Sequence, residues 1–285
     1  MSLVPVLRVL TPGAGASIQD LGRSGWKRFG IPPGGAMDLE SARKANLLVG
    51  NHEGAPVLEI LFAGARLELL RAAELALTGA DVDSGCPRWR SFSADSGFQI
   101  TLGSLRAGVW SYLAVRGGFV APRWFKSASV DRRAGFGEVA RAGSLLHGED
   151  LPRSSGISSR FIPALLRERF DEVPVISVWR GPEWGQFPAA VRARFLEEAW
   201  RVSRQSDRAG YRLEGPELEL SGFRMVSAPL AVGTVQVPGN GLPIVVLRDG
   251  PTVGGYPRLC LLDPSAISRF TQCAPETCVR FRLVG

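Results

Sequence analysis

An acidic residue stands next to an arginine in one Gly-rich loop of the sequence, where Asp207 is followed by Arg208 within residues 203–215. Arginine presents a planar set of N–H donors that matches a carboxylate or an amide. This pair, with Arg212 further along, could therefore orient a small substrate that carries such a group. The same pair could instead be a structural clamp that ties the loop to its barrel. Both interpretations remain open from these residues.

Residues 233–257 carry the densest group of candidate site residues. The apolar run 244–247 predicts a strand buried on both faces, which ends where the chain reaches a surface. The adjacent glycines that follow permit backbone angles closed to other residues and can bring amide N–H groups close to a ligand. The alternative is an ordinary tight turn between two barrel strands. On the functional interpretation, the substrate contacts are Gln236, Thr252, Gly254 and Gly255, and the candidates for a catalytic role are Asp207, Asp249 and Tyr256.

A third polar segment, residues 16–38, contains five glycines and two prolines. Loops of this length in compact domains are usually functional or packed as Ω-loops. Its candidate substrate-binding residues are Gln19, Asp20 and Arg23. Asp38 is assigned a structural role instead, because it is a good N-cap for a helix predicted over 39–49.

Short apolar runs separated by turn-forming residues recur through both halves of the sequence. This pattern is typical of antiparallel barrels that are closed or nearly closed, so the predicted fold is mainly β with a few short helices. The chain has 285 residues, and two domains are expected because a typical domain has roughly 100–200 residues. The polar, turn-rich segment 147–160 is the predicted linker. It gives one domain over residues 1–155 and a second over 156–285.

A short motif occurs in both halves of the sequence. The segment Gln19-Asp20-x-Gly-Arg23 is similar to Ser206-Asp207-Arg208-x-Gly210. Two related barrels would explain this repeat, although matches this short also arise by chance.

Composition and missing motifs argue against several classes of function. The formal net charge is +7, but the basic residues are almost all arginine and are spread along the chain, so no nucleic-acid partner is expected. The phosphate-binding motif G-x-x-x-x-G-K-[ST] does not occur, which means that the chain has no such loop of its own for ATP. The motif G-x-S-x-G is absent too, and with two histidines a Ser-His-Asp triad is not favoured.

Neither a metal site nor a membrane span is expected. The cysteines form no C-x-x-C pair, and the two histidines do not supply the close ligand pairs of a zinc site. No stretch reaches the roughly 18 apolar residues of a membrane helix, and the N-terminus lacks the basic region of a signal peptide. We therefore expect a cytoplasmic protein with reduced thiols at Cys86, Cys260, Cys273 and Cys278.

The motifs taken together resemble those of a known family. The sequence is similar over essentially its whole length to the KipA-like family, also called allophanate hydrolase subunit 2. This family includes the C subunit of bacterial ATP-dependent 5-oxoprolinase and the C-terminal half of the carboxyltransferase domain of urea carboxylase. The segments that carry the resemblance are SIQDLGRSGWKRFGIPPGGAMD at 17–38, ANLLVGN at 45–51, SYLAVRGGF at 111–119, SVDRRAGFG at 129–137, SDRAGYRLEG at 206–215, GTVQVPGNGLPIVVL at 233–247 and TVGGYP at 252–257.

The resemblance implies two tandem cyclophilin-like β-barrels and a role as one component of a hydrolase. In 5-oxoprolinase the implied partners are the KipI-like B subunit and the LamB/YcsF-like A subunit. The assembly uses ATP to open the lactam of 5-oxoproline to glutamate, so this chain is expected to be inactive without its partners.

Two other functions follow from the same resemblance. One is a carboxyltransferase that moves a carboxyl group from biotin to urea or a similar amide. The other is a non-catalytic regulator of the KipA type, which binds a KipI-like inhibitor of a histidine kinase.

Several loops depart from the family pattern, which leaves the substrate open. Gly34 stands where the family usually has Ser, and Pro251 where it often has Gln. The usual Glu-Gly ahead of the Gln-Val-Pro strand is Ala228-Pro229. The family segment Gly-Ser-Arg-Ser-Thr corresponds to residues 125–129, which read Phe-Lys-Ser-Ala-Ser.

Overall fold

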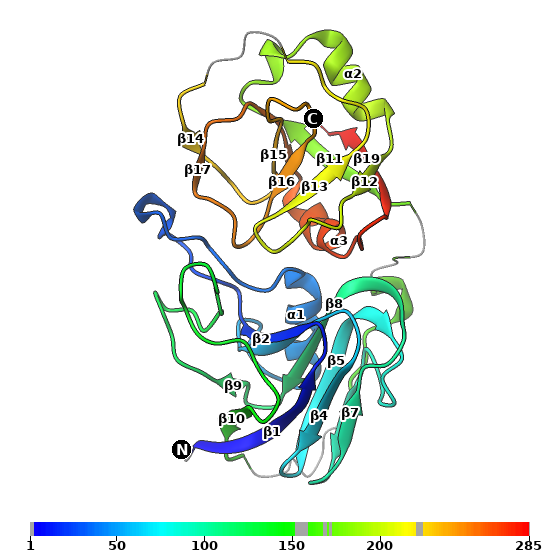
Figure 1. Ribbon diagram of the computed structural model, residues 1–285. Coiled ribbons are helices and arrows are strands. Elements are labelled where there is room, and N and C mark those ends of the chain that lie inside the picture. The colour runs from blue at the N-terminus through cyan, green and yellow to red at the C-terminus, as the bar shows by residue number, and fades with distance from the viewer. Residues whose placement is uncertain (1–2, 152–158, 168–169, 171–172, 221–224, 285) are drawn as a thin grey trace. The chain divides into compact units, whose positions relative to one another are not determined.

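The computed structural model describes residues 3–151, 159–167, 170, 173–220 and 225–284. The chain divides into two compact units (Figure 1). The first comprises residues 1–23 and 34–169, and the second comprises residues 24–33 and 170–285. The predicted domain boundary after residue 155 lies outside the described residues.

The first unit is built from two five-stranded sheets in which neighbouring strands run antiparallel. One sheet has the order β7-β4-β1-β10-β9 and the other the order β2-β3-β8-β5-β6. The bounds are β1 Leu3–Pro12, β2 Gly15–Gln19, β3 Val57–Leu61, β4 Ala65–Leu69, β5 Ala73–Val82, β6 Ser91–Ala94, β7 Gln99–Thr101, β8 Leu105–Val115, β9 Phe119–Val120 and β10 Leu145–Glu149.

The core of this unit draws on both sheets. Leu7 and Leu67 come from the first sheet and Leu58 and Leu113 from the second, and all four are fully buried in one hydrophobic cluster. Along β4, Ala65, Leu67 and Leu69 are buried and the residues between them are more exposed, because successive side chains on a strand point to opposite faces. One face of the strand therefore contributes to the core.

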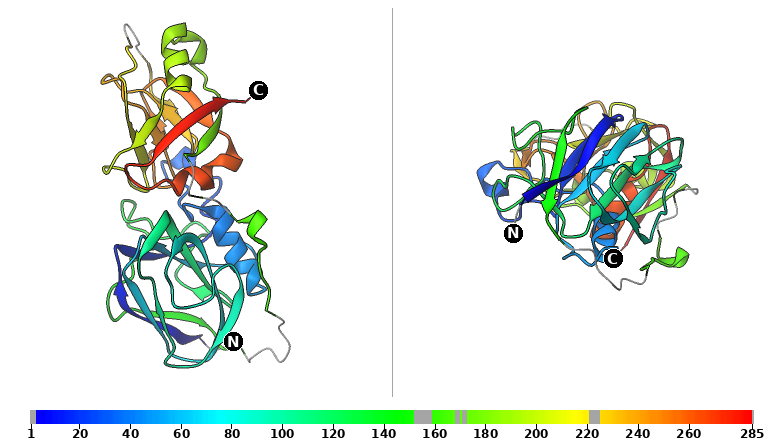
Figure 2. Two further views of the ribbon diagram at one scale, coloured as in Figure 1. Left: turned by 90° about the vertical axis from the view of Figure 1, so that its right-hand side faces the viewer. Right: turned by 90° about the horizontal axis from the view of Figure 1, so that it is seen from below.

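One α-helix, α1 (Leu39–Leu48), packs against β3, β5 and β8 of the second sheet (Figure 2). Its start confirms the predicted N-cap, since Asp38 accepts a hydrogen bond from the backbone N–H of Ser41 at 2.9 Å. The backbone N–H of Asp38 itself donates at 2.8 Å to the hydroxyl of Tyr112, which donates at 2.8 Å to Glu59. Burial and these two carboxylates raise the pKa of Tyr112 well above its ordinary value. A short 3₁₀ helix, η2 (Ala164–Leu166), completes this unit.

The second unit contains a closed barrel with the strand order β11-β18-β15-β16-β13-β12-β19. Its strands are antiparallel neighbours except for the parallel pair β11 and β19. The bounds are β11 Val175–Arg180, β12 Trp200–Val202, β13 Gly210–Glu214, β15 Thr234–Gln236, β16 Ile244–Val246, β18 Arg258–Leu262 and β19 Cys278–Leu283. The mainly β fold predicted from the sequence is thus confirmed.

Aromatic side chains fill the second unit beneath the helix α2 (Ala189–Glu197). Phe195 of this helix stacks on Phe281 of β19 with ring centroids 4.7 Å apart. The indole N–H of buried Trp200 donates to the carbonyl of Phe195 at 3.0 Å, so this large side chain leaves no polar atom without a partner. The remaining helical segments are η1 Lys27–Phe29, η3 Trp184–Gln186, η4 Pro264–Ala266 and α3 Ile267–Thr271.

A separate two-stranded sheet lies beside the barrel strands of this unit. It pairs β14 (Ala228–Pro229) with β17 (Val253–Gly254) in antiparallel register. Pro229 lacks a backbone N–H, and β14 tolerates this because it pairs with β17 alone and is an edge strand. Two positions that depart from the family pattern therefore pair directly with the Gly-rich loop at 252–257.

Segment 24–33 belongs to the second unit although its chain neighbours on both sides belong to the first. Part of the reason is a contact of Lys27, whose ammonium group donates a hydrogen bond to the carbonyl of Leu230. None of the helices in the described residues has the length and apolar content that a membrane span needs.

Candidate functional site

Arg208 and Asp249 form a bidentate ion pair in the second unit. The Nε of Arg208 donates to Oδ2 of Asp249 at 2.7 Å, and its Nη2 donates to Oδ1 at 3.0 Å. Their side chains are 19% and 8% exposed. The backbone N–H of Asp249 also donates to the carbonyl of Arg208 at 3.0 Å. This geometry joins the loop before β13 to the loop after β16, as the clamp interpretation requires, and a substrate role for Arg208 stays a prediction.

Asp207 and Arg212 flank this pair but point elsewhere. Oδ1 of Asp207 accepts the backbone N–H groups of Ala209 at 2.8 Å and Gly210 at 3.3 Å, so the carboxylate closes its own turn. Arg212 lies on β13 between buried Tyr211 and buried Leu213, and its own side chain is exposed. Because strand side chains alternate, Arg212 projects from the outer face of the barrel.

Gln236, Gly254 and Tyr256 come together where β15 meets the Gly-rich loop. The side-chain N–H of Gln236 donates to the backbone carbonyl of Tyr256 at 3.1 Å. A Cβ atom on Gly254 would lie 2.8 Å from Nε2 of Gln236 and 2.8 Å from Cδ1 of Leu230. Glycine is therefore required here by the approach of neighbouring side chains, whereas the sequence suggested that a ligand approaches.

Thr252 and Tyr256 lie on either side of the Gly254-Gly255 pair. Thr252 is buried, and its carbonyl accepts the backbone N–H of Leu230 at 2.9 Å. The side chain of Tyr256 is half exposed and so available at the surface of this loop. These two residues, with Gln236, supply hydroxyl and amide groups of the kind that bind a small amide.

Three charged residues of the second unit were missed by sequence reasoning. Arg258 donates to both carboxylate oxygens of Glu183, from Nε at 2.9 Å and from Nη2 at 2.6 Å. Its Nη1 donates to the carbonyl of Pro229 at 3.0 Å, next to the carbonyl of Leu230 that accepts from Lys27. Arg258 and Lys27 thus donate hydrogen bonds to the adjacent carbonyls of Pro229 and Leu230, at the end of β14.

The pKa values of these groups are shifted by their surroundings. The hydrogen bond from Arg258 lowers the pKa of Glu183 below its ordinary value. Partial burial lowers the pKa of Lys27, because the charged ammonium loses part of its hydration. No local motif links residues 27, 183 and 258, which lie in separate parts of the sequence.

Asp20 of the first unit is surrounded by donors from the loop 127–129. Its Oδ1 accepts the hydroxyls of Ser127 and Ser129, each at 2.6 Å, and its Oδ2 accepts the backbone N–H of Ala128 at 2.7 Å. Oδ1 also accepts the N–H of Gly22 at 2.8 Å. Asp20 is 5% exposed, so this carboxylate serves as the centre that holds the loop.

Gln19 and Arg23 bind the same loop from either side of Asp20. The amide of Gln19 donates to the carbonyl of Val130 at 3.0 Å, and the guanidinium of Arg23 donates to the carbonyl of Ser129. Arg23 also lies over the ring of Phe136, 4.8 Å from its centroid. A Cβ atom on Gly34 would collide with this guanidinium, so the glycine that replaces the family serine makes room for Arg23.

The altered segment 125–129 forms a tight hairpin turn. Trp124 and Ser127 exchange two backbone hydrogen bonds, at 2.8 and 3.1 Å, around Phe125 and Lys126. Both central residues have positive φ, 53° and 69°, a conformation that usually requires Gly or Asn. The turn therefore stores backbone strain of about 1–2 kcal/mol per residue. The contacts of the following serines with Asp20 help to offset it.

Within the part of the chain that the structure describes, no group of three or more His, Cys, Asp or Glu side chains is placed to bind a metal ion. The candidates from the sequence fall into separate sets. Arg208 pairs with Asp249, Gln236 contacts the loop of Gly254 and Tyr256, and the residues at 19–23 bind the loop of the first unit. The second unit offers hydrogen-bonding groups and the exposed guanidinium of Arg212, which suit a small amide or carboxylate.

Comparison with known proteins gives one family for nearly the whole chain. The family described as carboxyltransferase domain, subdomain A and B, matches residues 29–283. The chain is 35% identical to the C subunit of 5-oxoprolinase from Escherichia coli, over 97% of this chain and 94% of that protein.

Solved structures agree with this match. The structure of TTHA0988 superposes with a TM-score of 0.88 at 32% identity, covering 98% of this chain and 56% of that one. The Kluyveromyces lactis urea carboxylase superposes with a TM-score of 0.89 at 26% identity, covering 99% of this chain and 28% of that one. The chain thus spans about half or less of the length of these solved chains. The resemblance predicted from the sequence motifs is confirmed, and the chain belongs to the carboxyltransferase domain family that contains subdomains A and B.

Proposed function

We propose that this chain is the C subunit of an ATP-dependent 5-oxoprolinase, which hydrolyses the lactam of 5-oxoproline to glutamate. The observation that carries the proposal is the 35% identity to the corresponding 5-oxoprolinase component over 97% of the chain and 94% of the relative. A match over both full lengths supports the same role in an assembly better than a match to one part of a larger enzyme. We further propose a cytoplasmic location.

The polar groups of the second unit support a role in substrate binding. A lactam presents one N–H donor and one carbonyl acceptor, and 5-oxoproline adds a carboxylate. Gln236 and Thr252 supply amide and hydroxyl groups at buried positions, and half-exposed Tyr256 lies beside them on the loop. Arg212 is exposed and can meet a carboxylate. Asp207 and Asp249 remain the candidate acids, although both already accept hydrogen bonds within the protein.

ATP is assigned to another part of the assembly. The sequence lacks the motif G-x-x-x-x-G-K-[ST], whose loop binds phosphates. Among the described residues, those that we assign to the substrate include one exposed arginine, Arg212, and no phosphate-binding loop of this kind. We therefore derive no step through ATP from this chain. The Escherichia coli relative is named as one component of its enzyme, which implies others, and we propose a KipI-like protein and a LamB/YcsF-like protein as the partners.

Reconstitution with these partners tests the proposal. The chain is co-purified with the KipI-like and LamB/YcsF-like proteins of the same genome, and glutamate and ADP are measured with 5-oxoproline and ATP. We expect both products in equal amounts from the complete assembly and neither from this chain alone. In the same assay, Arg212→Ala is expected to raise KM for 5-oxoproline with little change in kcat.

Carboxyl transfer from biotin is the second candidate, because the matching family and the Kluyveromyces lactis relative are both named for carboxylation chemistry. A biotinylated carrier protein must then be present among the partners. Avidin blotting of the co-purified proteins and bicarbonate-dependent consumption of urea test this reaction. A stable complex with the KipI-like protein that turns over neither substrate would instead favour the regulatory role.

A further inference from the structure

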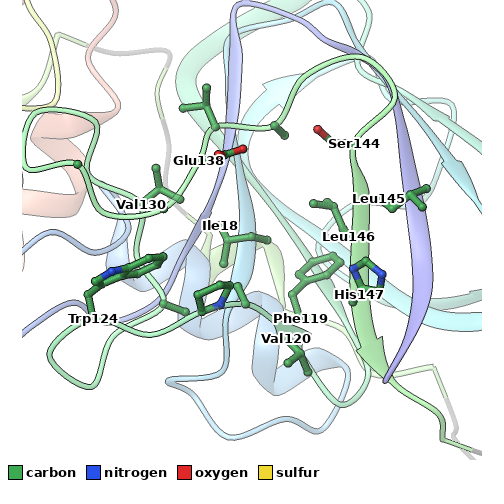
Figure 3. Close-up of a pocket in the computed structure, with 17 residues that line it drawn as sticks. Ile18, Phe119, Val120, Trp124, Val130, Glu138, Ser144, Leu145, Leu146 and His147 are labelled. Carbon is green, nitrogen blue, oxygen red and sulfur yellow. The ribbon is translucent and has the colours of Figure 1, made fainter. Parts of the chain in front are cut away.

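A hollow of about 550 Å³ opens in the first unit, between β2, β9, β10 and the loop 121–140 (Figure 3). Pockets that bind small molecules usually have volumes of about 300–1,000 Å³. Among the described residues, its lining contains none of the candidate substrate-binding residues. The hollow is therefore separate from the residues that the proposed lactam chemistry assigns to the substrate.

Apolar side chains from distant parts of the sequence form the walls of the hollow. Ile18, Phe119 and Val130 are buried beneath it, and Leu146 lies beside them (Figure 3). The indole of Trp124 forms one side. These groups favour an aliphatic or aromatic body, which leaves water on binding.

The position of the Trp124 ring is fixed by its neighbours. The ring stacks on Phe136 with centroids 6.2 Å apart. A Cβ atom on Gly137 would lie 3.4 Å from the indole and 3.0 Å from Val130, so the chain passes close behind both residues. A ring held in this way keeps its place in the wall of the hollow.

The charge of the lining is opposite to that of the whole protein. The chain has 34 Lys and Arg against 27 Asp and Glu, yet the described lining contains Glu138 and neither Lys nor Arg. Figure 3 shows the carboxylate of Glu138 directed into the hollow. No hydrogen bond or ion pair to its side chain is found within the residues that the structure describes. Next to Glu138 an anionic group would meet repulsion, and a cationic one would be attracted.

Ser144 and His147 complete the rim. Oγ of Ser144 accepts the backbone N–H of Arg141 at 2.9 Å, which fixes the hydroxyl at the edge of the hollow. The imidazole of His147, on β10, faces the same space (Figure 3).

We propose that this hollow binds a small organic amine in its protonated form, with the ammonium group on Glu138 and the apolar body against Ile18, Phe119 and Val130. A neutral molecule of the same shape gains the apolar contacts but loses the charge-assisted hydrogen bond, which is the stronger type. A carboxylate of the same shape is repelled.

Calorimetric titration with three matched probes tests the proposal on the purified chain at low salt. The probes are 3-phenylpropylamine, 3-phenylpropan-1-ol and 3-phenylpropanoate. The amine is expected to bind about tenfold more tightly than the alcohol, and the carboxylate more weakly than either. Added salt is expected to weaken binding of the amine and to leave that of the alcohol unchanged.

Three variants locate the binding site. Glu138→Gln keeps the shape of the side chain and is expected to lower the affinity for the amine about tenfold without affecting the alcohol. Glu198→Gln changes an exposed acid of the second unit and is the matched control, with no effect on either probe. Val120→Trp adds bulk at an exposed position of the lining and is expected to weaken both probes.

Equal affinity for amine and alcohol would overturn the proposal, as would an amine affinity that Glu138→Gln does not change. Failure of the folded wild-type chain to bind the amine up to its solubility limit would overturn it as well. Thermal unfolding of each variant shows that it is folded. Because the measurement needs neither ATP nor partner proteins, its outcome is independent of the proposed lactam hydrolysis.

Discussion

The motif that occurs twice in the sequence has different roles in the two units. Asp20 of the first unit follows β2 and accepts hydrogen bonds both from its own turn, at Gly22, and from a loop more than 100 residues away. Asp207 of the second unit precedes β13 and accepts hydrogen bonds from its own turn, two and three residues ahead. The arginines differ in the same way, since Arg23 binds a carbonyl and an aromatic ring whereas Arg208 binds a carboxylate. Similar residues beside similar glycines therefore do not imply similar chemistry.

The largest expected effect comes from removing the carboxylate of Asp20. Asp20→Ala removes the hydrogen-bond acceptor of two buried hydroxyls and two backbone N–H groups. Each buried polar group left without a partner costs about 1–3 kcal/mol. We expect the free energy of unfolding to fall by about 3 kcal/mol or more, measured by urea denaturation. Asp207→Ala is the matched comparison and is expected to cost about 1 kcal/mol or less, because its turn is exposed. Equal losses from the two variants would show that the two acids do not differ as described.

The Arg208–Asp249 pair is expected to give the next largest effect. Asp249→Asn leaves the partly buried guanidinium without its charge partner, and we expect a loss of about 2 kcal/mol in the free energy of unfolding. A double-mutant cycle with Arg208→Ala and Asp249→Ala isolates the energy of the pair. A coupling energy near zero would remove the structural role of the pair and would strengthen the claim that it serves the substrate.

A smaller effect is expected at Gly254, where the glycine makes room for Gln236. Gly254→Ala would press a methyl group against the Gln236 amide and Leu230, and such overpacking typically costs about 1–3 kcal/mol. We expect a loss near the lower end, because a two-stranded sheet can shift. In the reconstituted assembly the same variant is expected to raise KM for 5-oxoproline, whereas an unchanged KM would place Gln236 outside the substrate site.

The smallest effect concerns the pH dependence that Glu183 contributes. The hydrogen bond from Arg258 lowers the pKa of Glu183 in the folded state, so the ionised form stabilises the fold above the ordinary pKa near 4.5. This contribution is lost as the pH falls from that value through the lowered one. We expect it to amount to about 1 kcal/mol at most. Urea midpoints of the wild type and Glu183→Gln should therefore converge as the pH falls below 4.5, and curves that stay parallel would contradict the assignment.

Local patterns predicted the fold better than they predicted the contacts of the site. The apolar run at 244–247 predicted β16, and Asp38 predicted the start of α1, because strand alternation and helix capping depend on residues close in sequence. The family resemblance also followed from motifs alone. Whether an arginine beside an aspartate is a clamp or a ligand contact depends on a third residue far along the chain, here Asp249.

The features that the sequence did not predict share one physical cause. Segment 24–33 belongs to the second unit through contacts such as that of Lys27 with Leu230, and nothing within the segment specifies that partner. Glu183 and Arg258 are 75 residues apart, and the hollow beside Glu138 is formed by separate strands and a loop. Tertiary packing creates all three. The departures from the family pattern at Gly34 and Ala228-Pro229 were visible in the sequence, but their consequences required the neighbours that the structure supplies.

The central claim is that this chain completes a lactam-opening assembly, and product analysis of the reconstituted complex tests it most directly. With the KipI-like and LamB/YcsF-like partners, 5-oxoproline and ATP, we predict that glutamate and ADP form together and that omitting this chain abolishes both. Formation of an intact three-protein complex that releases no glutamate, or that instead carboxylates urea with a biotinylated carrier, would contradict the account.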